Sequence, residues 1–180
     1  MALHLRDLMQ RDVVAVAPDL TLRELVELFA EQEVSGAPVI SGGKVVGVVS
    51  TTDIYDLRDD VAGLAPGAAG TPGEGDIVGR KSAEPLGLYS DEWEPSDVDA
   101  QAWLRATRDE DWDILDAYTV AEIMTRNVVS QPSSTTVKKA ALYMLEAGIH
   151  RVLVIDGGVL QGIVTTTDIV RAVAEGRLKG

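Results

Sequence analysis

The hydrophobic positions of this chain follow one pattern twice, at a separation of 115 residues. In each copy, four apolar residues have the i, i+3, i+4, i+7 spacing of one helical face. They are Leu22, Leu25, Val26 and Phe29 in the first copy and Val137, Ala140, Ala141 and Met144 in the second. Residues 9–54 align with 124–169 without a gap, and sixteen aligned positions are identical. The pattern predicts two copies of one folding unit.

Each helical pattern is followed by two short apolar runs that a Gly-Gly turn separates. The first run reads APVI or VLVI, and the turn reads SGGK or DGGV. Such a pair of runs predicts a β-hairpin. The second run ends in VVSTTDI or IVTTTDI, where the Thr pair is expected to begin another helix. Thr21 and Thr136 are predicted N-caps of the earlier helices, and Glu24 would complete a capping box with Thr21.

Each unit is therefore predicted to run strand, helix, strand, strand, helix, an α/β (α+β) arrangement of two βαββα motifs. The expected spans are 12–16, 21–33, 37–40, 45–49 and 52–58 in the first unit, and 127–131, 136–147, 152–155, 160–164 and 167–175 in the second. A unit of about 50 residues is near the lower limit for independent stability. The two units are expected to bury their apolar faces against each other, with a pseudo-two-fold axis and a cleft between them.

The segment between the copies does not repeat, which divides the chain into 1–57, 58–118 and 119–180. Residues 58–119 contain 15 acidic and 5 basic side chains, whereas the rest contains 14 and 11. All three tryptophans, Trp93, Trp103 and Trp112, lie in this segment. Disordered acidic segments seldom concentrate tryptophan, so we expect a partly ordered arm. A flexible loop is the alternative.

Composition excludes several classes of function. The net charge of −13 argues against a nucleic-acid partner, because phosphate binding needs a basic face. The absence of cysteine excludes disulfides and thiolate metal sites, and His4 and His150 are the only histidines. The N-terminal sequence MALHLRDLMQ is charged where a signal peptide is apolar, and no apolar stretch approaches a membrane span. These features predict a soluble, cytoplasmic protein without a membrane partner.

The sequences Ser50-x-x-Asp53 and Thr165-x-x-Asp168 carry the candidate binding chemistry. One interpretation is purely structural, because Ser, Thr and Asp are favoured at the start of a helix. The functional interpretation adds that an ionised carboxylate at this place can accept two hydrogen bonds from a ribose diol. The same carboxylate would repel phosphate, so a nucleotide would need a cation elsewhere in the site.

A candidate cation lies in the second copy, where GIHRVLV places His150 and Arg151 at the entry of a predicted strand. Arginine offers a planar, multidentate donor for phosphate. The alternative is a surface arginine beside a half-buried histidine. The aligned positions in the first copy are Ser35 and Gly36, which carry no charge.

Four segments resemble a tandem pair of cystathionine-β-synthase (CBS) domains, often called a Bateman module. They are LMQRDVVAV, VSGAPVISGGKVVGVVSTTDI, VAEIMTRNVVSQP and GIHRVLVIDGGVLQGIVTTTDIVRAV. The resemblance implies adenosine-type ligands in the cleft, dimers of tandem pairs, and a ribose-binding role for the matching aspartates with Ser50 or Thr165 nearby. The pair formed by His150 and Arg151 resembles the phosphate-binding pair in the gamma subunit of AMP-activated protein kinase.

The resemblance also implies an apolar slot for adenine. Ordinary core packing is the alternative for each candidate residue. The candidates are Val14 on the first predicted strand, Val128, Val129 and Ser130 on its counterpart, and Ala37, Pro38 and Val152 at the strand entries. The second copy has Leu153 where the first has Pro38.

The sequence therefore predicts a regulatory module that binds AMP, ADP, ATP or another adenosyl compound as a ligand rather than as a cofactor. The phosphate-bearing site is expected at Asp168, and the site at Asp53 is expected to be weaker, empty or filled by an uncharged adenosine group. A homodimer that signals to a client protein in trans is expected. An interaction scaffold without a nucleotide is the alternative. An enzyme is not expected, since no GxSxG, P-loop or HExxH motif is present.

Overall fold

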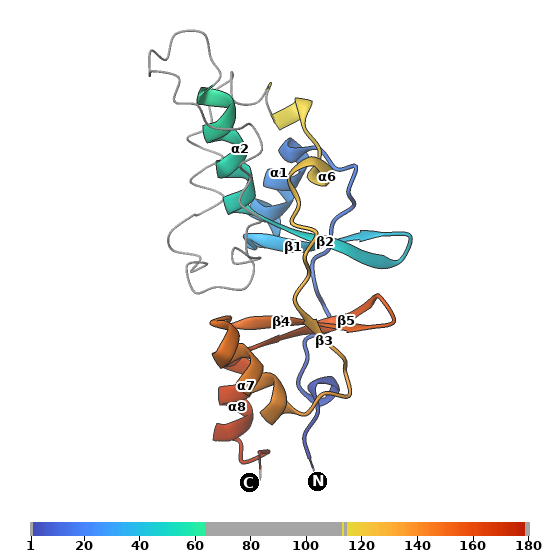
Figure 1. Ribbon diagram of the computed structural model, residues 1–180, viewed down its shortest axis with the longest axis vertical. Coiled ribbons are helices and arrows are strands. Elements are labelled where there is room, and N and C mark those ends of the chain that lie inside the picture. The colour runs from blue at the N-terminus through green and yellow to red at the C-terminus, as the bar shows by residue number, and fades with distance from the viewer. Residues whose placement is uncertain (1, 64–112, 114, 179–180) are drawn as a thin grey trace.

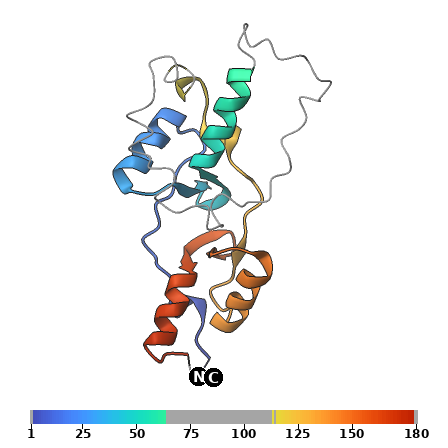
Figure 2. The ribbon, with the colours of Figure 1, turned by 90° about the vertical axis from the view of Figure 1, so that its left-hand side faces the viewer.

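The computed structural model describes residues 2–63, 113 and 115–178, so the predicted arm with Trp93, Trp103 and Trp112 lies outside the described part. Two lobes are stacked along the long axis of the molecule, one for each copy of the repeat (Figure 1). Their β-hairpins lie at the middle and their helices lie at the outer ends, as the rotated view also shows (Figure 2). The two hairpins contact each other through their second strands.

The main elements of the two lobes correspond one to one. The first lobe contains α1 (Leu22–Gln32), β1 (Gly36–Ser41), β2 (Lys44–Ser50) and α2 (Thr51–Gly63). The second contains α7 (Val137–Ala147), β4 (Arg151–Asp156), β5 (Val159–Thr165) and α8 (Thr166–Ala174). The described residues also include three short elements: the 3-10 turn η1 (Leu5–Asp7), α6 (Val120–Ile123) and β3 (Ser130–Gln131). The predicted α+β fold is confirmed.

The two hairpins are antiparallel and are closed by the predicted Gly-Gly turns. In the first turn Gly42 and Gly43 have φ values of 57° and 76°, and Gly157 and Gly158 have 60° and 87°. Two consecutive residues with positive φ are what a tight two-residue hairpin turn requires, and glycine adopts them without steric cost. Both hairpins also contain a register irregularity at the same place, Val39/Ile40 and Val154/Ile155.

The predicted first strand of each unit is wrong in extent. The expected strand 12–16 is reduced to one parallel bridge, in which Val16 pairs with Val39. The expected strand 127–131 is reduced to β3, whose two residues run parallel to β4. Each segment passes from one lobe to the other and reaches the hairpin only at its end, so it runs beside a strand for one or two residues (Figure 1). The helix expected at 52–58 is also too short, because α2 continues to Gly63.

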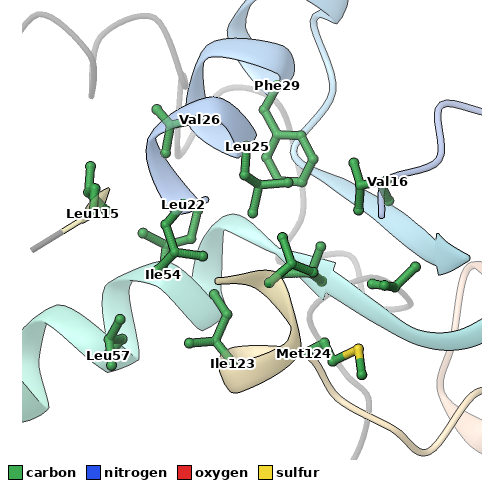
Figure 3. Close-up of a cluster of buried hydrophobic side chains, with 14 of the residues drawn as sticks. Val16, Leu22, Leu25, Val26, Phe29, Ile54, Leu57, Leu115, Ile123 and Met124 are labelled. Atoms are coloured by element: carbon green, nitrogen blue, oxygen red, sulfur yellow. The ribbon is translucent and has the colours of Figure 1, made fainter. Parts of the chain in front are cut away.

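Each lobe has its own core of aliphatic side chains. Phe29 of α1 is completely buried in the first core, among side chains from both helices and from the chain that returns after the insert (Figure 3). Leu115, Ile123 and Met124 belong to this returning chain. Met144 occupies the matching position in the second core.

The segments that precede each motif pack on the opposite lobe. The backbone N–H groups of Leu5 and Arg6 donate to the carbonyls of Thr135 and Ser133 of the second lobe, at 2.9 and 3.1 Å. Leu5 is completely buried in the second core. The first lobe receives the matching residues of the second copy, since Val120 and Ala121 donate to the carbonyls of Leu20 and Pro18 at 2.9 and 2.8 Å. This reciprocal exchange gives the module its pseudo-two-fold symmetry.

The two crossing segments meet the hairpins at glycine. Gln10 and Ile163 exchange two backbone hydrogen bonds of 2.9 Å, and Thr125 and Val48 do the same at the matching place. A Cβ atom at Gly162 would collide with the carbonyl oxygen of Gln10. One at Gly47 would lie 2.9 Å from the carbonyl oxygen of Thr125. The repeated glycine is therefore needed for close approach of two backbones.

The last residues of the predicted insert also belong to the first lobe. The side chain of Leu115 is buried in the first core. Arg23 of α1 forms two hydrogen bonds with the carboxylate of Asp116, and its Nε donates at 2.6 Å. Across residues 2–63 and 115–178, no helix combines the length and the apolar character needed to cross a membrane.

Candidate functional site

The second Thr-Thr-Asp sequence, Thr166–Asp168, begins α8 directly after β5. Thr165 is the N-cap, and its hydroxyl accepts from the backbone N–H of Asp168 at 3.3 Å. In return, Oδ2 of Asp168 accepts from the backbone N–H of Thr165 at 2.9 Å and from its hydroxyl at 2.8 Å. The Asp168 carboxylate is held at the start of the helix with only 4% of the residue exposed.

The Thr51–Asp53 sequence at the start of α2 shares the carboxylate half of this geometry. Oδ2 of Asp53 accepts from the backbone N–H of Ser50 at 2.7 Å and from its hydroxyl at 2.8 Å. Ser50 is buried and Asp53 is half-buried. The prediction that Thr165 caps α8 is confirmed, and the carboxylate half of that arrangement is also present at Ser50 and Asp53.

The strand entries are tied to these helix starts by backbone hydrogen bonds. The backbone N–H of Thr166 donates to the carbonyl of His150, and that of Thr51 donates to the carbonyl of Ser35, both at 2.8 Å. The predicted cation site is therefore adjacent to the predicted carboxylate site in the second lobe. The same place in the first lobe is occupied by Ser35, which is buried and uncharged.

Arg151 lies directly opposite Thr165 in the antiparallel pair of β4 and β5. Directly opposed residues project to the same face of a sheet, with their Cβ atoms about 4.5–5.5 Å apart. The side chain of Arg151, which is half-buried, therefore starts beside Thr165, the N-cap of α8. In the first lobe Gly36 lies opposite Ser50, so that face carries no cation at this position.

Two residues at this site were missed by the sequence reasoning. The Nε2 atom of Gln10 donates to Oδ1 of Asp168 at 3.1 Å, from a position 158 residues earlier in the chain. A guanidinium nitrogen of Arg171 lies 3.4 Å from the same oxygen, and 60% of that side chain is exposed. The i, i+3 spacing of Asp168 and Arg171 was readable in the sequence. The contact of Gln10 was not, because it depends on the crossing of the N-terminal segment.

The residues expected to form the adenine pocket fall into two groups, those that are buried and those that are half-buried. Ala37 and Val152 are completely buried, so their side chains present no surface to a ligand and only their backbone could contact a base. Pro38 is also buried, and its carbonyl accepts from the backbone N–H of Val16 at 3.0 Å. The remaining candidates are half-buried, namely Val14, Val128, Val129 and Ser130.

Comparison with known proteins places both copies in one family. The family model of the CBS domain matches residues 5–60 and 120–175. An uncharacterized protein of Methanocaldococcus jannaschii, MJ1426, is 30% identical over 174 residues, which cover 93% of this chain and 89% of that protein. Another from the same organism, MJ1232, is 45% identical over 51 residues, but these cover 28% of this chain and 17% of its own length.

Two solved structures show the same fold over nearly the whole chain. CBSX2 in complex with AMP has a TM-score of 0.60 at 23% identity, with 98% of this chain and 99% of that chain covered. The CBS domain pair of protein MJ0100, in complex with 5′-methylthioadenosine and S-adenosyl-L-methionine, has a TM-score of 0.57 at 18% identity, with 99% and 100% covered. Because the family model matches both copies and the fold agrees, the chain belongs to the CBS domain family and contains two CBS domains in tandem.

Proposed function

We propose that the protein is a regulatory module that binds an adenine nucleotide and passes the signal to a partner in trans. The observation that carries the proposal is the juxtaposition in the second lobe of a capped carboxylate, Asp168, with an arginine opposite its cap. The adenosine-type ligands of CBSX2 and of the MJ0100 domain pair support the ligand class.

The chemistry assigns a different part of the ligand to each group. A carboxylate accepts strong hydrogen bonds from the ribose hydroxyls and repels phosphate. A guanidinium binds phosphate oxygens with two parallel N–H donors. The sugar would therefore lie at Asp168 and the phosphate toward Arg151 and His150. The first lobe has Ser35 and Gly36 at the matching positions, so its site at Asp53 would favour an uncharged adenosine group or bind more weakly.

Isothermal titration with AMP and with adenosine tests this assignment. We expect Arg151→Ala to weaken AMP binding by about tenfold or more, since a hydrogen bond to a charged group contributes about 1.5–3 kcal/mol. Adenosine, which has no phosphate, should bind this variant as it binds the unmodified protein. Lys138→Ala is the control, because Lys138 is an exposed cation on α7. Unchanged AMP affinity in Arg151→Ala would show that Arg151 does not hold the phosphate.

A homodimer is the expected assembly, and exposed apolar side chains on the second lobe support it. Leu142 and Leu145 of α7 are 51% and 79% exposed, and Val170 and Val173 of α8 are 64% and 60% exposed. Apolar residues gathered on one pair of helices are typical of an interface. Light scattering should give twice the chain mass for the unmodified protein and the chain mass for Leu145→Glu. A dimer that survives this substitution would place the interface elsewhere.

An interaction scaffold without a nucleotide is the second candidate, and the same exposed helices favour it. Thermal melting with AMP, ADP, ATP, adenosine and S-adenosylmethionine separates the two functions. A site held at about 100 times its dissociation constant stabilises the protein by about 2.7 kcal/mol. A shift with one of these ligands supports the sensing module, whereas an unchanged melting temperature with all of them supports the scaffold.

A further inference from the structure

The carboxylate expected to hold a ribose already makes four contacts within the chain. A carboxylate has about four lone-pair positions, two on each oxygen. Oδ2 of Asp168 accepts from the N–H and the hydroxyl of Thr165. Oδ1 accepts from Gln10 at 3.1 Å and contacts Arg171 at 3.4 Å. A sugar hydroxyl can therefore reach this carboxylate only by replacing one of these donors.

The donors differ in how easily they can be replaced. The contacts of Thr165 are part of the cap of α8, and their loss would expose the first turn of the helix. Arg171 is one helical turn away from Asp168 and mostly solvent-exposed, so its contribution is weak. Gln10 is exposed, and its side-chain amide is a neutral donor at the position a sugar hydroxyl would take. The Gln10 amide is thus the donor that resembles the ligand.

The backbone holds Gln10 at this place. Gln10 and Ile163 exchange two backbone hydrogen bonds of 2.9 Å, and the preceding turn is anchored by the buried side chain of Leu5. Arg177, beyond α8, also donates to the carbonyl of Asp7 at 2.9 Å. Because the segment is fixed at both ends, the amide is delivered to Asp168 at high local concentration. Displacement would move only the side chain.

We infer that Gln10 is an affinity-determining residue of the second site, where its side-chain amide competes with the ribose of the ligand for Oδ1 of Asp168. This inference rests on the proposed function. It adds that the site is partly self-occupied, so that a ligand must first displace a group of the chain itself. The Gln10 side chain would then report whether the site is filled.

The first lobe lacks both of these donors at the aligned positions. Thr125 aligns with Gln10 and keeps the same backbone pairing, with Val48 in place of Ile163. Asp56 aligns with Arg171 and is an acceptor when ionised. The Gln10 amide therefore has no counterpart at the aligned position of the first copy.

Substitution of Gln10 tests the competition directly. In Gln10→Ala, adenosine and AMP should both bind the second site about three- to tenfold more tightly, as expected when a competing hydrogen bond to a charged group is removed. The two factors should be equal, because the same group is displaced by either ligand. Thr125→Ala is the matched control and should leave both affinities unchanged. Unchanged or weaker binding in Gln10→Ala would overturn the inference, since weaker binding would make Gln10 a contact of the ligand.

The side-chain amide of Gln10 gives a second measurement. Its NMR signals should move to the position of a solvent-exposed glutamine in Asp168→Ala, which removes the acceptor, and should move in the same direction when adenosine saturates the unmodified protein. Signals that stay in place at saturation would overturn the inference.

These measurements separate the inference from the proposed function. If AMP binds with a requirement for Asp168 but Gln10→Ala has no effect, only the competition is rejected. If neither the unmodified protein nor Gln10→Ala binds any adenine compound, the proposed function is rejected and the competition with it. Binding that is detected only after Gln10→Ala would support both.

Discussion

The backbones of the two lobes are more alike than their side chains. Gly47 and Gly162, and Asp53 and Asp168, have the same structural roles in the two halves. Two of the differences bear on function, one beside the helix starts and one on the outer helix surfaces. The repeat therefore preserves what the crossing of the two segments requires. The side chains around Asp53 and Asp168 differ between the lobes.

The outer helices show the second difference. All five exposed large hydrophobic residues in the described part of the chain belong to the second lobe, namely Leu142, Leu145, Val159, Val170 and Val173. In the first lobe, Glu27 and Ala30 align with the two leucines, and Ala30 is covered. Leu115, from the segment that returns after the insert, packs into the first core beside α1. Among the described residues, exposed large hydrophobic side chains are thus a feature of the second lobe alone.

The interlocked segments should produce the largest effect on stability. Leu5→Ala is expected to lower the free energy of unfolding by about 2–5 kcal/mol, because it removes a completely buried leucine side chain from the second core. Val120→Ala, at the matching position in the first core, should cost about 1.5–3 kcal/mol. Denaturant unfolding followed by circular dichroism measures both. If the lobes are interlocked, each variant should unfold in one transition. Two separated transitions would show that each lobe folds alone.

Substitution of the repeated glycine should have the next largest effect on stability. Gly162→Ala is expected to cost about 1–3 kcal/mol, the usual range for overpacking, because the added methyl group meets the backbone of Gln10. Gly47→Ala should cost somewhat less, since part of its contact is with the flexible side chain of Met124. Gly42→Ala is a useful contrast, as its expected penalty comes from a positive φ rather than from crowding. Equal stability of Gly162→Ala and the unmodified protein would contradict the close approach.

Loss of a helix cap should have a smaller effect. Thr165→Ala and Ser50→Ala are each expected to cost about 0.5–2 kcal/mol. Thr165→Ser keeps the hydroxyl that donates to Asp168 and serves as the control. Thr165→Ala should also change nucleotide affinity, because the carboxylate loses one of the donors that orient it. If capping were the only role of the motif, stability would fall while the nucleotide affinity stayed the same.

Lowering the pH should have the smallest effect, and it should destabilise the first lobe more than the second. Hydrogen bonds from Thr21 and Thr119 lower the pKa of Glu24 and Glu122, and the Arg23 side chain lowers the pKa of Asp116. These three groups lie on the first lobe. Bonds from Ser133 lower the pKa of Asp156 on the second. A lowered carboxyl pKa gives stability that is present above the ordinary value of about 4 and is lost as pH falls through the native value.

We therefore expect amide protection in α1 to fall more than that in α7 when the pH is lowered from neutral to below 4. Hydrogen exchange measured by NMR compares the two helices in one sample. Glu24→Gln removes one of the titrating groups and should reduce the difference. An equal loss in both helices would mean that these carboxylates do not set the acid stability of the first lobe.

Much of the local structure could be predicted from the sequence because it depends on neighbouring residues. The i, i+3, i+4 pattern, the Thr21–Glu24 capping box and the Gly-Gly turns are short-range features, and the structure contains each of them. The two capped aspartates are of the same kind, since their partners lie three residues away. The repeat offset also identified which positions would correspond between the lobes.

What the tertiary structure alone decided is which distant segments meet. The first strands were predicted too long, because a periodic apolar run does not show that the segment leaves one lobe for the other. The contact of Gln10 with Asp168 spans 158 positions and depends on that crossing. Leu115 counted as part of an acidic insert by composition, yet it completes a core. Local sequence determined the geometry of the two aspartates, and the crossing of the chain determined which residues surround each candidate site.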